Sequence, residues 1–215
     1  VTPKFNSPVT QINVLDGKAI VTISTGEQFE ADNCIVTVGA WAKTLLDDTE
    51  LNLPVQATRK TFAWFEAPEK LYSEGIYPGF TFQFGNESYY GFPSIGGAGL
   101  KVGRHDGGQA IHPSDAKAPF GTVEGDLEDL QQFLSGYMPS VGAFKEGKTC
   151  MYAMTPDEDF IIDSHPNHKE IILAAGFSGH GFKFASAVGE ALSEMAQYQQ
   201  TTIDLTPFQL NRFKD

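Results

Sequence analysis

The chain has 215 residues, of which 41% are hydrophobic and 20% are charged, proportions typical of an ordinary soluble globular protein. Its formal net charge of −12 argues against a broad phosphate-binding surface, which needs clustered Lys and Arg, so we expect no nucleic-acid partner. No stretch approaches the roughly 20 apolar residues that a membrane-spanning helix requires, so we expect no membrane association.

The N-terminal residues and the two cysteines bear on the origin of the chain. Residues 1–4 resemble neither an initiator segment nor a signal peptide, so we expect a piece of a longer protein. Cys34 and Cys150 lie far apart and form no C-x-x-C pair, which favours a reducing, cytoplasmic location. Because Cys34 belongs to an apolar run, we predict that it is a small core residue.

The segment 8–38 predicts a β-meander followed by a buried strand. Alternating apolar residues flank turn signals at 16–17 and 25–26, and the run 35–38 is continuously apolar. This strand ends at Gly39 and leads into a short helix. Such a turn lets the backbone approach a ligand closely, although a plain tight turn would show the same pattern.

The middle of the chain predicts a second β-rich unit between residues 54 and 105. Its aromatic and β-branched runs, separated by Gly, Pro and Asn, are 60–65, 80–84, 89–92 and 99–102. A loop over 106–122 precedes a predicted helix at 124–137, where apolar residues recur at helical spacing. Residues 148–163 are predicted to be extended.

The last third predicts a buried strand at 170–175, a glycine-rich loop at 176–181 and a helix at 182–198. Strand–glycine–helix segments therefore flank a β-rich middle. We predict an α+β chain in which an antiparallel substrate domain is inserted into part of a dinucleotide-binding fold.

The glycine-rich loop is the strongest chemical feature. Glycines near a helix start leave backbone N–H groups accessible, and the helix dipole makes that end suitable for negative charge. Lys183 lies in this first turn, where the same dipole disfavours a cation unless an anion lies in front of it. A glycine-rich turn with a solvated lysine is the alternative.

Three further motifs leave alternatives open. Cys150 is either a packing residue or a thiolate able to form a thioether. Lys101 and His105 share one side of an extended chain, where they would hold a carboxylate or stabilise reduced oxygen, unless that side is simply solvated. His165 and His168 flank a proline, which indicates a turn, and we expect no metal site.

These segments together resemble a known family. The blocks that carry the resemblance follow in order along the chain: Tyr89-Tyr90-Gly91-Phe92-Pro93, Gly99-Leu100-Lys101, His105, Cys150-Met151-Tyr152, Asp157-Glu158, Phe160-Ile161-Ile162-Asp163 and the run 176–184. They are similar to monomeric sarcosine oxidase and N-methyltryptophan oxidase, within the D-amino-acid-oxidase-like FAD-dependent oxidoreductases. The resemblance spans about residues 9–210.

The resemblance implies roles for individual residues. Cys150 would carry FAD through a thioether to the flavin 8α-methyl group, and Lys101 would favour electron transfer to O₂. The other implied cofactor-binding residues are Met151, Gly179, His180, Gly181, Lys183, Val9, Thr37, Gly39 and Trp41. The implied catalytic residues, which face the flavin or the substrate, are Lys101, His105, Tyr90, Tyr152 and Lys183.

The resemblance also implies a domain division and a reaction. Residues 1–52 and 148–215 would belong to the FAD-binding domain, and 53–147 would form the substrate-binding domain. The reaction would be oxidative demethylation of sarcosine, giving formaldehyde and H₂O₂. The alternatives are oxidation of N-methyltryptophan or another secondary amine, and a non-catalytic domain that binds small carboxylates.

Two departures from the family pattern modify these expectations. The family's G-x-G-x-x-G strand–helix and its substrate-binding arginine have no counterpart here, so we expect a missing N-terminal segment, an inactive isolated chain and weak FAD binding. Arg104 is expected beside the substrate pocket, where an aromatic residue is commoner. An aromatic wall is expected from Phe62, Phe82, Tyr90 and Phe92.

Overall fold

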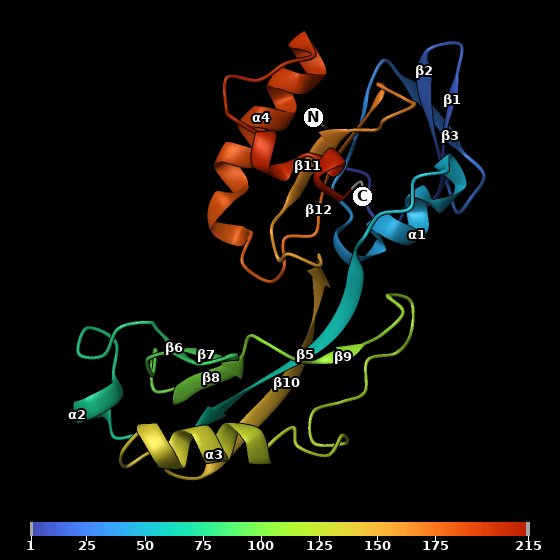
Figure 1. Ribbon diagram of the computed structural model, residues 1–215. Helices are drawn as coiled ribbons and strands as arrows, with labels where there is room; N and C mark the ends of the chain where they lie inside the picture. The colour runs from blue at the N-terminus through green and yellow to red at the C-terminus, as the bar shows by residue number, and fades with distance from the viewer. Residues whose placement is uncertain (1, 214–215) are drawn as a thin grey trace. The chain divides into compact units, whose positions relative to one another are not determined.

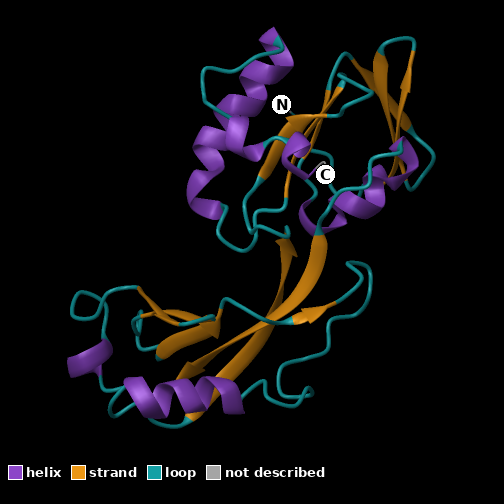
Figure 2. Cartoon of the chain, viewed as in Figure 1, coloured by secondary structure: helices purple, strands orange, loops and turns teal. Residues whose placement is uncertain are grey.

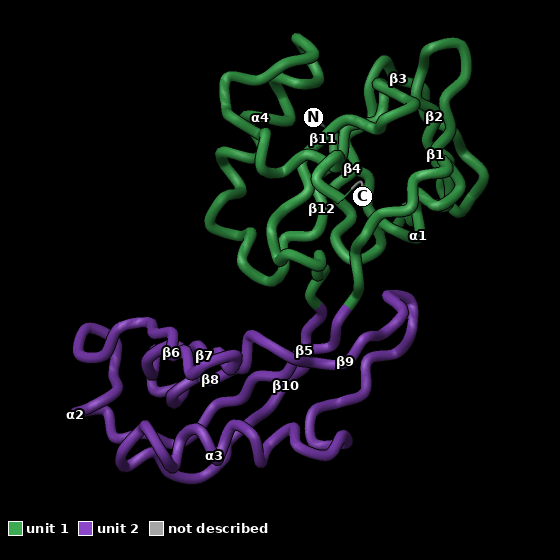
Figure 3. The backbone as a smooth tube through the Cα atoms, viewed as in Figure 1, with its two compact units in different colours: residues 1–57, 152–215 green, residues 58–151 purple. Residues whose placement is uncertain are grey.

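The computed structural model describes residues 2–213 and divides into two compact units (Figure 3). Unit 1 comprises Val1–Ala57 and Tyr152–Asp215, and unit 2 comprises Thr58–Met151. The chain passes between the units within β5 (Gln56–Phe65) and again within β10 (Phe144–Met154). Helices and mostly antiparallel strands are combined in the chain (Figure 2), so the α+β class is confirmed.

The first sheet of unit 1 is the expected meander. It contains β1 (Val9–Leu15), β2 (Lys18–Ile23) and β3 (Gln28–Ala31), paired antiparallel in that order. Asp16 and Gly17 connect the first two strands with φ values of 50° and 73°. Positive φ at both central positions is the geometry of a tight hairpin turn, which explains why an Asp-Gly pair is found there.

The second sheet of unit 1 has the order β11 (Ile161–Ser164), β12 (Ile171–Ala175), β4 (Cys34–Val36), with β12 and β4 parallel. Every residue of β12 is buried because both faces of the strand are covered. Its odd-numbered residues join a core that includes Leu46, and its even-numbered residues pack in a core with Leu192. A strand buried on both faces is continuously apolar, as the sequence indicated.

The helices of unit 1 flank these sheets (Figure 1). They are η1 (Gly39–Trp41), α1 (Ala42–Leu46), η2 (Asp47–Thr49), η3 (Phe182–Phe184), α4 (Ala185–Tyr198), η4 (Thr206–Phe208) and η5 (Leu210–Phe213). The helix predicted over 182–198 thus begins with a 3₁₀ turn. No helix in the described part of the chain is long and apolar enough to span a membrane.

Unit 2 is built on a six-stranded sheet. Its strands are β5, β6 (Phe80–Phe84), β7 (Glu87–Phe92), β8 (Leu100–Arg104), β9 (Gln109–Ala110) and β10. Their order is β10-β5-β8-β7-β6, and the short β9 pairs with β5. Two helices, α2 (Glu69–Tyr72) and α3 (Glu128–Tyr137), accompany the sheet. The helix predicted to begin at residue 124 begins at 128, because Gly125 has a φ of +89°, which a right-handed helix does not accept.

The two faces of the unit 2 sheet differ in character. On the face covered by α3 (Figure 1), Ala63, Phe65 and Val102 pack with apolar residues of that helix. On the other face, Lys101 lies directly opposite Trp64 of β5 and Phe92 of β7. Directly opposed residues point to the same side of a sheet. We call this side, which carries Phe62, Trp64, Phe92 and Lys101, the Lys101 face.

Candidate functional site

The first part of the candidate site is an edge of the unit 1 sheet. The parallel strands β4 and β12 are neighbours, so the loops that follow them emerge at the same edge. After β4 the chain passes through Thr37 and Gly39 to Trp41, and after β12 it enters the loop 176–181. Ligands of open α/β sheets bind at the carboxyl ends of such strands. The structure thus brings two predicted cofactor-binding segments to one edge.

The glycine loop is anchored to the end of β10. Ser178 is fully buried with a φ of 47°, and its N–H donates to the carbonyl of Ala153 at 2.9 Å. Its hydroxyl donates to Gly176 O at 3.2 Å and accepts from the N–H of Thr155 at 3.3 Å. These bonds fix the backbone of the loop, so its amides are held in one arrangement.

At two glycines of this loop an aromatic ring packs so close to the backbone that a Cβ atom would collide with it. A Cβ on Gly179, whose φ is +81°, would lie 2.1 Å from the ring of Tyr152. A Cβ on Gly181 would lie 2.5 Å from the ring of Phe177. Gly179 and Tyr152, both expected at the flavin site, are therefore in direct contact within unit 1.

The start of the following helix has no side-chain cap within residues 2–213. No side chain among the described residues caps η3 or α4, so their first N–H groups lack the usual side-chain acceptor. Lys183 is exposed in η3 and its Nζ lies 5.2 Å from the ring centroid of Phe184. His180 donates from Nδ1 to Ser178 O at 3.2 Å, and its ring packs 4.9 Å from that of Phe160. This end of the helix favours a negative charge.

The second part of the candidate site is the Lys101 face of unit 2. The Nζ of Lys101 lies 4.3 Å from the ring centroid of Phe62, 5.3 Å from that of Trp64 and 5.7 Å from that of Phe92. Tyr90 of β7 is opposite Gly103, and a Cβ on Gly103 would lie 2.8 Å from the Tyr90 ring. Lys101 and Tyr90 thus share one aromatic wall.

Cys150 is electrostatically coupled to this face. Burial lowers the pKa of Lys101, the thiol of Cys150 opposes that effect, and Lys148 reinforces it. Burial also raises the pKa of Cys150, while the ammonium groups of Lys117, Lys101 and Lys60 pull it down. Cys150 is half-buried and unpaired by any disulfide. The pKa of Cys150 is raised overall because burial outweighs these cations, which lie around a thiol on a strand next to β5.

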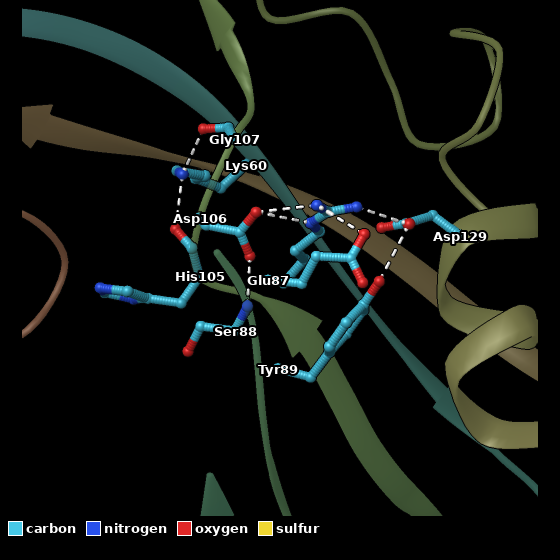
Figure 4. A network of polar contacts seen from close by, with 9 residues as sticks. Lys60, Glu87, Ser88, Tyr89, His105, Asp106, Gly107 and Asp129 are labelled. Atoms are coloured by element: carbon cyan, nitrogen blue, oxygen red, sulfur yellow. Dashed lines mark hydrogen bonds and ion pairs between the residues drawn. The ribbon is translucent and has the colours of Figure 1, made fainter. Parts of the chain in front are cut away.

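His105 follows β8 and its backbone is held from two sides. Its N–H donates to Ser88 O at 2.7 Å, and its carbonyl accepts from the buried ammonium of Lys60 at 2.6 Å (Figure 4). Lys60 also donates to the carbonyl of Gly107. Because β8 ends at Arg104, the common side expected for Lys101 and His105 stays a prediction.

Arg104 corrects one expectation from the sequence. It does not line the Lys101 face, because it lies opposite Tyr89, whose ring packs on Phe133 of α3. Its guanidinium instead binds three carboxylates, Asp106 at 2.8 Å, Asp129 at 2.7 Å and Glu87 at 3.3 Å. Asp106, mainly through its hydrogen bond, and Asp129 raise the pKa of Arg104.

Phe82 does not lie on the Lys101 face, and Val9 lies outside the sheet that contains β4 and β12, so its contact with the cofactor stays a prediction. Phe82 is opposite Tyr89, and its ring lies 5.5 Å from that of Phe133, so it belongs to the α3 face and not to the aromatic wall. Val9 lies in β1, in the other sheet of unit 1, where it packs against the core that contains Val36.

The two histidines of the turn at 165–168 have a structural role. His165 is buried, its Nδ1 accepts from the N–H groups of Asn167 and His168 at 3.1 Å, and its Nε2 lies 3.1 Å from the Thr49 hydroxyl. Within residues 2–213, no three His, Cys, Asp or Glu side chains are grouped to hold a metal ion. Cys34 is half-buried against the core, and burial raises its pKa.

Each part, taken by itself, has groups that fit a flavin. Gly179 and Gly181 carry backbone where a Cβ would collide with aromatic rings, and an uncapped helix start follows them. The Lys101 face supplies a cation on an aromatic surface and a thiol affected by nearby cations. A flavin has an electron-rich ring, which amides and a cation stabilise, and a methyl group that a thiol can attach to.

Sequence reasoning did not single out Trp64, Lys148 and Lys60. Trp64 contacts Lys101 and Lys148, whose Nζ atoms both lie 5.3 Å from its ring centroid. Alternation within the strand would have indicated Trp64, because it follows Phe62 by two residues. Lys60 and Lys148 could not be found without the pairing of β5 with β10 and with the loop after β8.

Comparison with solved structures defines the class of fold. L-proline dehydrogenase from P. horikoshii matches 96% of this chain and 54% of its own with a TM-score of 0.79 and 20% identity. Glycine oxidase from Geobacillus kaustophilus matches 96% and 52% with a TM-score of 0.75 and 20% identity. At this identity the likeness establishes a shared fold.

Sequence comparison gives the family. Residues 1–195 match the DAO family, described as FAD dependent oxidoreductase. This chain belongs to that family. N-methyl-L-tryptophan oxidase from Shigella flexneri is 44% identical over 211 residues, which are 98% of this chain and 55% of that protein. The Escherichia coli K12 enzyme of the same name is 43% identical over the same coverage. The chain therefore spans about half the length of the curated relatives it matches.

Proposed function

We propose that this chain forms the flavin-attachment and substrate-facing part of an FAD-dependent oxidase of N-methyl amino acids. The observation that carries the proposal is the Lys101 face, where an ammonium group lies on aromatic rings and is coupled to the thiol of Cys150. Membership in the FAD dependent oxidoreductase family supports the same assignment.

Each group on the chain has a distinct task in this proposal. Bound FAD would supply the two-electron redox chemistry, namely oxidation at the N-methyl carbon of the substrate and reduction of O₂. Cys150 holds the cofactor through its sulfur, and Lys101 presents positive charge where O₂ becomes reduced. The amides at the start of η3 favour negative charge on the cofactor.

The remaining residues shape the substrate cavity. Tyr90 lies on the Lys101 face and His105 follows β8, so we assign both to the substrate side within unit 2. Tyr152 would contribute its ring, which is held against Gly179. Met151, Thr37, Gly39 and Trp41 would contact the cofactor, and Val9 would support the sheet that carries it.

We propose N-methyl-L-tryptophan as the first substrate to test and sarcosine as the second. The relatives quoted above carry the name N-methyl-L-tryptophan oxidase, which favours a bulky side chain over the methylene of sarcosine. In both cases one amine, one O₂ and one water would give one amino acid, one formaldehyde and one H₂O₂.

The test is turnover by the flavin-loaded full-length protein that contains this chain, because the chain spans only about half the length of its relatives. We expect equal amounts of formaldehyde and H₂O₂, with a higher kcat/KM for N-methyl-L-tryptophan than for sarcosine. A higher kcat/KM for sarcosine would move the substrate assignment to small amino acids. A colourless protein that binds carboxylates but forms no product from either amine would contradict the oxidase and favour a binding domain.

A further inference from the structure

The ammonium of Lys101 is surrounded by ring faces from two neighbouring strands. Phe62 and Trp64 come from β5 and Phe92 from β7, at 4.3, 5.3 and 5.7 Å from Nζ to the ring centroids. Strand register creates this arrangement, because Trp64 and Phe92 are the residues directly opposite Lys101. All three distances lie within the range of cation–π attraction.

Trp64 has contacts on several sides. Its ring meets the ring of Phe62 edge to face, with centroids 5.3 Å apart and an interplanar angle of 71°. The Nζ of Lys148 on β10 lies 5.3 Å from its centroid, as the Nζ of Lys101 does. The indole of Trp64 thus contacts two ammonium groups, and the ring of Phe62 packs against it.

The charge on Lys101 is not neutralised by a carboxylate. Among residues 2–213, no salt bridge to an Asp or Glu involves Lys101, and the titratable groups that shift its pKa are Cys150 and Lys148. A flexible lysine normally gains its orientation from an acidic partner. Here the ring faces supply the orientation and leave the full positive charge available.

We propose that Trp64, braced by Phe62, is a positioning residue that holds the Lys101 ammonium where electrons pass to O₂. The inference rests on the proposed oxidase function. In that step two electrons and two protons go to O₂ to give H₂O₂, and Lys101 ends with the same proton count as it began. Trp64 takes no part in the chemistry, since it acts only through the placement of Lys101.

The kinetic test compares two substitutions in the flavin-loaded protein. Trp64→Leu removes the ring face, and Trp64→Phe keeps one. We expect the second-order rate of reaction with O₂ to fall about tenfold in Trp64→Leu and to stay within about twofold in Trp64→Phe. The rate of reduction by the amine should change less than about twofold in either variant. Equal slowing of both half-reactions, or no rescue by Phe, would overturn the proposal.

A second measurement is independent of the reaction. Lysine amines are labelled by reductive ¹³C-methylation, which keeps their charge, and the Lys101 signal is assigned by its loss in Lys101→Arg. Ring currents should shift this signal upfield, and Trp64→Leu should move it toward that of a free lysine.

A matched control comes from Lys4, whose Nζ lies 4.4 Å from the ring centroid of Phe29. Phe29→Leu should shift the Lys4 signal and leave that of Lys101 unchanged. If no amine were oxidised by the intact protein, the proposed function would fail but the lysine spectrum would still decide the placement of Lys101. A Lys101 signal unmoved in Trp64→Leu would overturn the inference.

Discussion

Lys101 shows how one residue acquires a special environment from its neighbours. Strand register places it between Trp64 and Phe92, and burial together with Lys148 lowers its pKa against the opposing effect of Cys150. Aromatic faces attract the ammonium without cancelling its charge. The side chain is therefore ordered and still able to stabilise negative charge that develops nearby.

Replacing Lys101 by Met tests this role, because Met keeps a similar length and loses the charge. We expect the reaction with O₂ to slow about 100-fold, the effect typical of removing one electrostatic stabiliser, while reduction by the amine changes far less. Stopped-flow measurements of the two half-reactions provide the comparison. Equal slowing of both would show that Lys101 has no special part in the reaction with O₂.

His165 gives the chain a pH dependence that is separate from catalysis. Burial, the neighbouring His168 and two N–H donors directed at Nδ1 all disfavour the protonated ring, so its pKa is lowered. In the unfolded chain the same group takes up a proton near pH 6.5. Below that pH the unfolded state binds more protons than the folded one, and stability is lost as the pH falls.

We therefore expect the free energy of unfolding to decrease between about pH 7 and pH 5, measured by urea denaturation at each pH. His165→Asn should flatten this dependence, since Asn keeps an acceptor near the Nδ1 position without the titrating ring. His112 is exposed, and His112→Asn should leave the dependence unchanged. A slope that persists in His165→Asn would show that another group causes it.

At the scale of elements, the strand–glycine–helix segment depends on backbone that only glycine can adopt. Gly179 has a φ of +81° and lies against the Tyr152 ring, whereas Gly189 lies exposed in α4 with open space beside its Cα. The two glycines thus differ in what an added methyl group would meet. The loop requires glycine at position 179, whereas Gly189 is a helix residue with a low helix propensity.

Opposite effects are expected from one and the same substitution at these two positions. Gly179→Ala should destabilise the protein by about 1–3 kcal/mol, because of the positive φ and the collision with Tyr152. Gly189→Ala should stabilise it by about 0.5–1 kcal/mol. Chemical denaturation of both variants gives the comparison, and a neutral Gly179→Ala would contradict the described loop.

The elements that sequence predicted well are those with an unambiguous pattern. β12 was predicted because a strand buried on both faces is apolar throughout, and the hairpin at 16–17 because Asp-Gly accepts two positive φ values. The start of α3 was predicted four residues early. Leu127 continues the apolar spacing, but only the structure shows that Gly125 has a positive φ, which a right-handed helix does not accept.

The candidate site was predicted in part for a similar reason. Phe62, Tyr90 and Phe92 are predicted to form one aromatic wall, and the structure has all three on the Lys101 face. Arg104 and Phe82 were placed there wrongly, since the face of each side chain depends on cross-strand register, which a single sequence does not reveal. Trp64 was missed because its importance comes from Lys101 and Lys148 on two other strands.

At the scale of the whole molecule, the two units divide the proposed tasks. Unit 1 supplies amides at the carboxyl ends of β4 and β12, and unit 2 supplies the aromatic face with Lys101 and Cys150. The chain matches the FAD dependent oxidoreductase family over residues 1–195, which spans both units. We propose that unit 1 forms part of the FAD-binding domain and unit 2 the substrate domain.

The proposed attachment of flavin to Cys150 is the claim on which the function depends most. Cys150 is affected by three lysines, whereas Cys34 is packed in the core with no such cations acting on it. A thiolate at Cys150 is therefore the better nucleophile, although burial raises the pKa of both thiols. Cys34→Ser provides the matched control for Cys150→Ser.

The direct measurement is mass spectrometry of peptides from the flavin-loaded, denatured protein. We expect the flavin mass on the peptide that contains Cys150, its loss in Cys150→Ser and its retention in Cys34→Ser. Flavin that separates from the wild-type chain on denaturation, or that is found on Cys34, would contradict the account.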